Sequence, residues 1–246
     1  MQADRTLALD PANALEESRQ LAASIKPGSD RWDVIVVGSG AAGGMAAFQL
    51  AMAGVKVLLL EAGRMIDVRT EYRTMEWPYA WVRSRILGGK TNFWGRGALR
   101  YGPLQFNAAS RDGFDVDWPI SYDDVKPYYD KVDVLLGCSG TIEGLAQVPD
   151  GVFQRPSKLN CVEVAFKRAI AKMGRHYIPG RAGVTTDGVL NNKYRARCAG
   201  RGRCGRGCDI QAAFHSPTAL IYPARDSGNL TVRPYSIVSE VLLGEA

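Results

Sequence analysis

The clearest pattern of apolar and polar segments in the chain lies in residues 33–63. Residues 34–37 form an unbroken β-branched run between a polar residue and a glycine, which is typical of a buried strand in a parallel sheet. The next residues predict a helix over about 41–53, followed by a second apolar strand over 55–60. This order of strand, helix and strand predicts an α/β fold.

The same kind of pattern predicts further elements along the rest of the chain. Two late apolar runs predict strands over 230–232 and 236–243, and a strand that returns so late is expected to rejoin the first sheet. Helices are predicted over about 10–25, 121–136, 161–173 and 219–225, and Ser121 and Asp124 are placed to form a capping box.

A glycine-rich turn joins the first predicted strand to the first predicted helix. It is Gly38-Ser39-Gly40-Ala41-Ala42-Gly43, which matches the pattern G-x-G-x-x-G. Gly38 lets the chain turn out of the strand, Gly40 leaves room for a pyrophosphate, and Gly43 lets the helix pack close to the strand. The helix begins here, so its unpaired N–H groups and partial positive charge face the phosphates.

The second predicted strand ends on Glu61, which lies 18 residues after Gly43. A carboxylate at this place accepts hydrogen bonds from the ribose hydroxyls of an adenosine and repels a 2′-phosphate. A glycine-rich turn without a ligand is the alternative, but such a turn would not need Glu61. The combination therefore predicts an adenine dinucleotide site.

A second glycine-rich segment, GGKTNFWGRG, occupies residues 88–97 and has four glycines in ten residues. Glycines give a ligand access to backbone N–H groups, and Thr91 and Asn92 can donate or accept hydrogen bonds. This composition suits a loop pressed against a planar ligand. A glycine-rich surface turn is the alternative interpretation.

A cysteine- and arginine-rich segment spans residues 191–210. Its cysteines Cys198, Cys204 and Cys208 follow the spacing C-x5-C-x3-C among six basic residues. An iron–sulfur cluster held by three thiolates is one interpretation. A zinc site that adds His215 is a second, and buried or disulfide-bonded cysteines in a glycine–arginine loop are a third. An RNA-binding tract would be unusually short.

Length and composition limit the classes of protein that fit. The 246 residues, 46% apolar and 23% charged, indicate a globular chain of one or two domains. The net charge of +6 is interpreted as a local basic patch and not as a nucleic-acid surface, and the odd number of five cysteines argues against a disulfide scaffold. The sequence shows no apolar run of ~18 residues and no signal peptide, so we expect no integral membrane segment and a cytoplasmic or peripherally membrane-associated location.

The chain resembles the glucose–methanol–choline (GMC) family of flavin oxidoreductases. The resemblance rests on three segments that occur in this order: residues 33–63, the loop 88–97 and the segment 198–243. The likeness is nearest to the large subunits of bacterial gluconate and glucose dehydrogenases. It covers most of the chain from about residue 32 and includes DWPISY at 117–122 and SPTALIYPARDSGNLTV at 216–232. It implies a Rossmann-like FAD-binding domain with part of a substrate or cap domain.

The resemblance implies which residues bind FAD. The pyrophosphate would be held by Gly38, Gly40 and Gly43, with Ser39 also among the cofactor-binding residues, and the adenosine ribose would be bound by Glu61. The flavin would be lined by Gly88, Gly89, Thr91 and Asn92, and the adenine would meet the backbone of Val238. Some relatives attach the flavin covalently to a histidine of the glycine-rich loop. Phe93 stands nearest to that position here, so we expect non-covalent FAD. Cys198, Cys204 and Cys208 match the spacing in subunits that hold a three-iron cluster.

The resemblance also implies an activity. The intact enzyme would oxidise the CH–OH group of an alcohol or sugar, with a base that removes the hydroxyl proton while a hydride passes to the flavin. The electrons would leave through an iron–sulfur cluster, through a cytochrome subunit or to oxygen. The family's catalytic histidine lies near the C-terminus and has no counterpart here, so we expect an inactive N-terminal fragment of a chain about twice as long.

The predicted organisation has four parts: a helical leader at 1–30, the first part of the FAD-binding domain at 31–105, a partial cap or substrate-side insertion at 106–190, and the Cys/Arg-rich loop with the return to the FAD-binding domain at 191–246.

Two other classes of protein stay open. A different FAD enzyme such as a disulfide reductase would need a cysteine pair soon after the dinucleotide motif, and residues 44–137 contain none. A non-enzymatic metal- or RNA-binding module would leave that motif unexplained.

Overall fold

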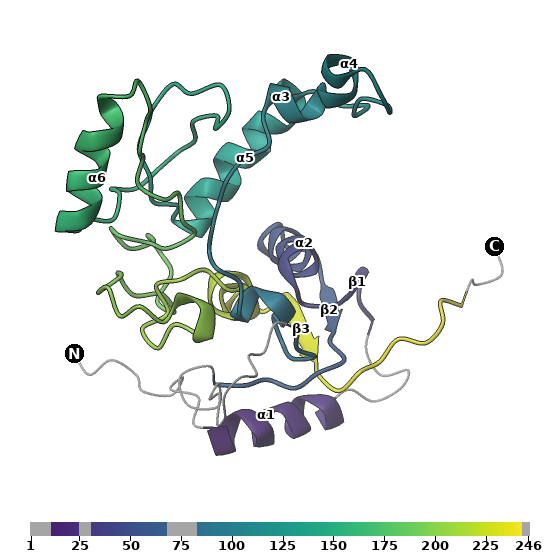
Figure 1. Ribbon diagram of the computed structural model, residues 1–246. Helices are drawn as coiled ribbons and strands as arrows, with labels where there is room; N and C mark the ends of the chain where they lie inside the picture. Colours follow the sequence, from purple (N-terminus) through teal and green to yellow (C-terminus); the bar gives the residue numbers. More distant parts are fainter. Residues whose placement is uncertain (1–10, 25–30, 68–82, 243–246) are drawn as a thin grey trace. The chain divides into compact units, whose positions relative to one another are not determined.

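The computed structural model describes residues 11–24, 31–67 and 83–242 of the chain (Figure 1). These residues divide into two compact units. The first contains the described residues up to Gly95 together with Asn192–Arg195 and those from Gly200 onward, and the second contains Arg96–Asn191 and Ala196–Ala199. Each unit buries apolar side chains of its own, such as Leu59 in the first and Leu136 in the second.

The first unit is built on a three-stranded parallel sheet (Figure 1). Its strands β1 (Val34–Val37), β2 (Val57–Leu60) and β3 (Leu230–Arg233) lie in the order β1-β2-β3. Val57 in β2 is aligned with Val34 on one side and with Leu230 on the other. The prediction that a late strand rejoins the first sheet is therefore confirmed.

β2 is the most buried strand because it has a neighbouring strand on each side. Val57 and Leu59 of this strand are fully buried. The helix α2 (Ala41–Met52) packs against the sheet through small residues, of which Ala47 and Ala51 are fully buried. Small side chains let this helix approach the strands closely, as the glycine pattern predicts.

Further helical segments cover the same core. The π-helical turn η3 (Pro217–Ile221) continues directly into α7 (Tyr222–Asp226), and both pack against α2, with Ile221 fully buried. The helix α1 (Pro11–Ser24) packs against β3 and buries Ala14 (Figure 1). The helices predicted for these two segments are confirmed within the part of the chain that the structure describes.

β1 differs from the fully buried strand that the sequence predicts, because its side chains Ile35 and Val37 are 59% and 61% exposed. In the described residues, β1 pairs only with β2, so no strand lies along its other edge. A parallel strand is normally covered on both faces. The prediction of burial is therefore wrong for these two side chains and right for β2.

The regular elements of the second unit are helices. The helix α5 begins with the predicted capping box, in which the Ser121 N–H donates to Asp124 Oδ2 at 2.8 Å and the Asp124 N–H donates to Ser121 Oγ at 3.3 Å. It ends at Gly137, which has a φ of 64°. The helices of this unit are α3 (Pro103–Phe106), α4 (Ala108–Asp112), α5 (Tyr122–Leu136) and α6 (Cys161–Ala171). None of the helices described in either unit is long and apolar enough to cross a membrane.

Two buried arginines stabilise the second unit. Arg100 donates to Asp133 Oδ2 from Nε at 3.2 Å and from Nη2 at 2.5 Å, and to Asp130 at 2.7 Å. Arg181 donates to Asp150 at 2.7 Å. Burying a guanidinium is costly unless it is paired, so these contacts allow both arginines to link segments that are distant in sequence.

The strand predicted over 236–243 is wrong for residues 236–242, to which the structure assigns no strand, and residue 243 lies outside the described residues. The alternating apolar side chains that suggested a strand are exposed: Ile237 by 67%, Val241 by 78% and Leu242 by 80%. A strand needs a hydrogen-bonding neighbour, and the described part of the chain provides none for this segment.

Leu59→Ala should lower the free energy of unfolding by about 2–5 kcal/mol, because it removes a fully buried side chain from the central strand. Ile35→Ala is the matched control, since it shortens an exposed side chain of β1 and should change stability by less than about 0.5 kcal/mol. Urea unfolding followed by circular dichroism measures both. Equal losses in the two variants would contradict the burial described for this sheet.

Candidate functional site

The turn between β1 and α2 brings the start of the helix close to the end of the strand. The Gly38 N–H donates to the Leu60 carbonyl oxygen at 2.8 Å, and Gly38 has a φ of 88° that favours glycine. A side chain on Gly43 would overlap with the carbonyl oxygen of Gly38. Only glycine at position 43 therefore allows the helix to begin so near the turn.

The N-terminus of α2 has the space and the charge that a phosphate group needs. A Cβ atom placed on Gly40 would have no other atom within 4 Å. No side chain caps this helix, and its first turn contains no acidic residue. The first N–H groups of a helix have no partner within the helix and carry a partial positive charge. The pyrophosphate of FAD therefore fits this turn.

Glu61 follows β2 and is only 8% exposed. Its Oε2 accepts hydrogen bonds from the N–H of Ser39 at 3.1 Å and from the hydroxyl of Ser39 at 2.5 Å, and its Oε1 accepts from the Gly63 N–H at 2.9 Å. A carboxylate can accept about four hydrogen bonds, so it retains capacity for a ribose hydroxyl. The acid therefore lies directly beside the glycine-rich turn.

The Ser39 hydroxyl links this carboxylate to the second glycine-rich loop. Ser39 is fully buried, and its Oγ also accepts a hydrogen bond from the Gly88 N–H at 2.7 Å. The sequence placed Ser39 among the cofactor-binding residues without a role for its side chain. In the structure, the side chain connects the glycine-rich turn at residues 38–43, Glu61 and the loop that begins at Gly88.

Thr91 connects the second glycine-rich loop to a segment late in the chain. The 3₁₀ turn η1 (Gly89–Asn92) contains Thr91, whose hydroxyl donates to the Gly88 carbonyl oxygen at 2.5 Å and accepts from the Ser216 N–H at 3.0 Å. A side chain on Gly88 would overlap with the ring of Pro217. The loop and the start of η3 are therefore in direct contact.

Asn92 stabilises the loop in a similar way. Its Nδ2 donates to the carbonyl oxygens of Leu87 and Gly89, both at 3.0 Å, and the residue is only 1% exposed. A Cβ atom on Gly89, in contrast, would have no atom within 4 Å. The polar side chains of Thr91 and Asn92 thus bond to protein backbone, and their contact with a flavin stays a prediction.

The segment that contains Val238 starts beside the end of β2. The Tyr235 N–H donates to the Gly63 carbonyl oxygen at 3.1 Å, and the Ser236 N–H donates to the Glu61 carbonyl oxygen at 2.8 Å. Val238 lies two residues further on and is 37% exposed. Its predicted backbone contact with adenine is not tested by this geometry.

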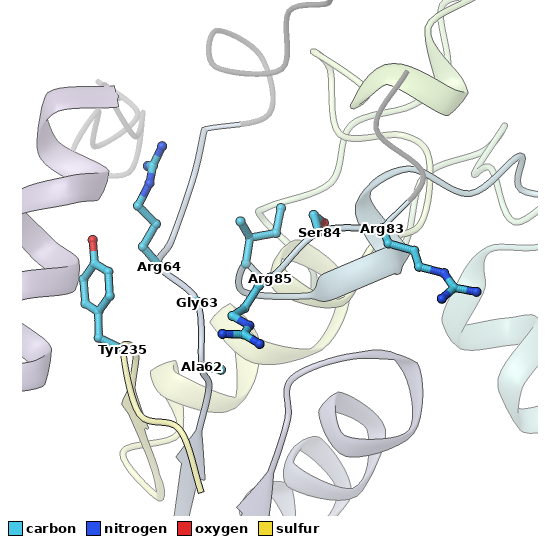
Figure 2. Close-up of a pocket in the computed structure, with 8 residues that line it drawn as sticks. Ala62, Gly63, Arg64, Arg83, Ser84, Arg85 and Tyr235 are labelled. Atoms are coloured by element: carbon cyan, nitrogen blue, oxygen red, sulfur yellow. The ribbon is translucent and has the colours of Figure 1, made fainter. Parts of the chain in front are cut away.

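An open pocket of about 660 Å³ lies at the end of β2 (Figure 2). It is lined by Ala62, Gly63 and Arg64, by residues 83–86 and by Tyr235. This volume is typical of a site for a small molecule. Sequence reasoning gave no role to Arg85 or Tyr235; the available signal was an arginine three residues before the pair Gly88-Gly89.

The three cysteines of the predicted cluster are divided between the two units. Cys204, at the start of the 3₁₀ turn η2 (Cys204–Arg206), and Cys208 belong to the first unit, whereas Cys198 belongs to the second. None of the five cysteines, all of which lie in the described residues, forms a disulfide. Among the described residues, no three histidine, cysteine, aspartate or glutamate side chains are grouped so that they could hold a metal ion. A cluster or a zinc site on these cysteines therefore stays a prediction.

Arg195 shows that the basic residues of this segment do not all lie on the surface. It is only 6% exposed, its Nη2 donates to the Ala212 carbonyl oxygen at 2.9 Å, and its guanidinium lies 5.9 Å from the centre of the Phe214 ring. Burial lowers the pKa of Arg195 to about 10, against an opposing effect of Cys208. At least one residue of the expected basic patch, Arg195, is therefore buried and bonded to the protein backbone.

Comparisons with known proteins agree with this geometry. The FAD binding domain family matches residues 33–73. The 6'''-hydroxyparomomycin C oxidase of Streptomyces lividus is 30% identical over 79% of this chain and 40% of its own length. The 2-methyl-1,2-propanediol dehydrogenase of Mycolicibacterium austroafricanum is 28% identical over 87% of this chain and 43% of its own length. The fructose dehydrogenase large subunit of Gluconobacter japonicus is 25% identical over 77% of this chain and 42% of its own length.

The chain thus spans about two fifths of the length of the curated relatives that it matches. The matched FAD binding family begins at Asp33 and includes β1, α2, β2 and Glu61. The predicted Rossmann-like α/β fold for FAD is confirmed, and so is the resemblance to flavin oxidoreductases of GMC type.

Ser39→Ala should lower the free energy of unfolding by about 1–3 kcal/mol, because Gly88 and Glu61 would each lose a buried hydrogen-bond partner. Ser236→Ala is a suitable control, since that hydroxyl makes a single bond, to the Pro234 carbonyl oxygen at 3.2 Å, in a partly buried place. Urea titration of both variants measures the difference. If Ser39→Ala is as stable as the control, the hydroxyl does not hold the three segments together.

Proposed function

We propose, from the confirmed resemblance to the GMC flavin oxidoreductases, that this chain is the FAD-binding part of an enzyme that oxidises the CH–OH group of an alcohol or sugar. FAD would be bound without a covalent link. When bound, FAD accepts the hydride that leaves the substrate carbon. The chain's own contribution is to bind and orient this cofactor.

The observation that carries the proposal is the open N-terminus of α2 next to a buried acid. Gly40 leaves space above helix N–H groups that no side chain caps, and Glu61 lies in hydrogen-bond contact with the same turn. We assign the pyrophosphate to Gly38, Gly40 and Gly43, and the adenosine ribose to Glu61. The carboxylate accepts from ribose hydroxyls and repels a 2′-phosphate, which favours FAD over a phosphorylated dinucleotide.

The flavin is assigned to the loop that begins at Gly88. The backbone of Gly88 and Gly89 would face it, and Thr91 and Asn92 would preserve the shape of the loop through the backbone bonds described above. Phe93, which is 8% exposed, has no nucleophilic atom, in agreement with a flavin that is not attached to the protein. We assign no catalytic base to the residues of this chain.

The names of the relatives support the class of substrate. They include an oxidase named for 6'''-hydroxyparomomycin C, a dehydrogenase named for 2-methyl-1,2-propanediol and a dehydrogenase named for fructose, and the last is named as a large subunit. We infer that the present enzyme acts on an alcohol or sugar and that an electron-transfer subunit such as a cytochrome accepts its electrons. The predicted insertion 106–190 lies within the second unit, which we assign to the substrate side. An iron–sulfur cluster on Cys198, Cys204 and Cys208 has no support from the geometry of the described residues.

Gly40→Ala tests the proposal, because the added methyl group would occupy the space through which a phosphate approaches the backbone. It should weaken FAD binding at least about tenfold without changing the melting temperature, since the methyl group meets no protein atom. Titration of the chain with FAD, followed by flavin fluorescence, measures the dissociation constant.

Gly180→Ala is the matched control, because it adds the same methyl group into open space in the second unit. It should bind FAD as the unchanged chain does. Equal affinity of the Gly40→Ala chain and the control would contradict the place assigned to the pyrophosphate, and no binding by the unchanged chain at saturating FAD would contradict the proposed cofactor.

A further inference from the structure

The phosphate turn lacks a cation of its own. Residues 38–53, which form the turn and α2, contain neither lysine nor arginine. A diphosphate carries about two negative charges, whereas a helix N-terminus supplies only about half a positive charge, and Glu61 adds a further negative charge nearby. A site for a dinucleotide at this turn would therefore gain from a full positive charge supplied by another segment.

The pocket at the end of β2 contains three arginines that could supply this charge, and they differ in direction (Figure 2). Figure 2 shows the Arg85 side chain pointing toward Ala62, at the end of β2, whereas Arg83 and Arg64 point away from it. Arg64 also donates from Nη1 to the Met65 carbonyl oxygen at 3.0 Å. Arg85 is thus the arginine directed toward the proposed cofactor site.

Backbone contacts of Arg85 and of the three residues after it hold Arg85 in this place. Arg64 and Ile86 form a parallel bridge, and the Leu87 N–H donates to the Arg64 carbonyl oxygen at 2.9 Å. A side chain on Gly63 would overlap with the backbone of Arg85, so glycine there lets this segment lie directly against the end of β2. On the other side, the Gly88 N–H bonds to Ser39 in the phosphate turn. Arg85 therefore lies on a short segment that contacts Gly63 and Arg64, just after β2, and that bonds to Ser39 in the glycine-rich turn.

The Arg85 guanidinium is available to a ligand. Arg85 is exposed, and within the described residues its side chain has no hydrogen bond and no ion pair. The same holds for Arg83, two residues earlier. The two arginines are thus alike in exposure and in lacking a partner, and they differ in where they point (Figure 2).

We propose that Arg85 binds the diphosphate of the dinucleotide from the side opposite the N-terminus of α2. The inference rests on the proposed function, because it concerns the same cofactor site. The guanidinium is planar and presents paired N–H groups, a geometry that matches phosphate oxygens. Arg85 would thus supply the positive charge that the glycine-rich turn lacks.

Calorimetric titration with ADP and with adenosine tests this inference, because ADP contains the diphosphate and needs no flavin site. Arg85→Gln should weaken ADP binding about tenfold and leave adenosine binding unchanged, because only the diphosphate contact is lost. Arg85→Lys should restore part of the affinity. Arg83→Gln is the matched control and should bind both ligands as the unchanged chain does. Raising the salt concentration should weaken ADP binding less in the Arg85→Gln chain than in the unchanged chain.

Three other outcomes would overturn the inference, and a fourth would overturn the proposed function instead. Equal ADP affinity in the Arg85→Gln and Arg83→Gln chains would show that Arg85 does not contact the diphosphate. An equal loss of affinity for adenosine and for ADP in the Arg85→Gln chain would mean that Arg85 stacks on the base instead. Failure of the unchanged chain to bind ADP while it binds FAD would overturn the inference and leave the proposed function standing. Arg85-dependent binding of ADP without any binding of FAD would overturn the proposed function and leave the diphosphate contact of Arg85 standing.

Discussion

The hydroxyl group of Ser39 is the interaction on which the candidate site depends most. It is fully buried, donates to Glu61 and accepts from the backbone of Gly88. Without it, a buried carboxylate and a buried N–H group would lose a partner, and such unsatisfied groups are costly in a protein interior. This one hydroxyl therefore brings together three segments that are distant in sequence: the glycine-rich turn after β1, Glu61 and the second glycine-rich loop.

The glycines around this hydroxyl divide into two kinds. Side chains on Gly43, Gly63 or Gly88 would overlap with neighbouring atoms of the chain, so these glycines allow segments to pack backbone against backbone. Gly40 and Gly89 border open space instead, and they are the positions where the proposed cofactor would come closest to the backbone. Close packing at three positions thus leaves two places open, and both lie in the loops assigned to FAD.

The parts of this structure that could be predicted are those with local signals. The β1-α2-β2 unit follows from a β-branched run, a glycine pattern and an apolar run, and the capping box of α5 follows from Ser121 and Asp124. The direction of the Thr91 side chain could not be predicted, because its partner Ser216 is brought to it by the tertiary fold. The strand expected after Pro234 failed for a related reason, since alternating side chains do not supply the neighbour that a strand needs. Arg85 was missed because an isolated arginine has no local pattern.

The central claim is that this chain binds FAD without a covalent link at the turn between β1 and α2. The visible absorbance spectrum of the purified chain, saturated with FAD, freed of unbound cofactor and then precipitated with acid, tests it most directly. We expect a yellow protein with two absorbance bands whose colour passes entirely into the supernatant. A folded chain that stays colourless, or one whose colour remains in the precipitate, would contradict this account.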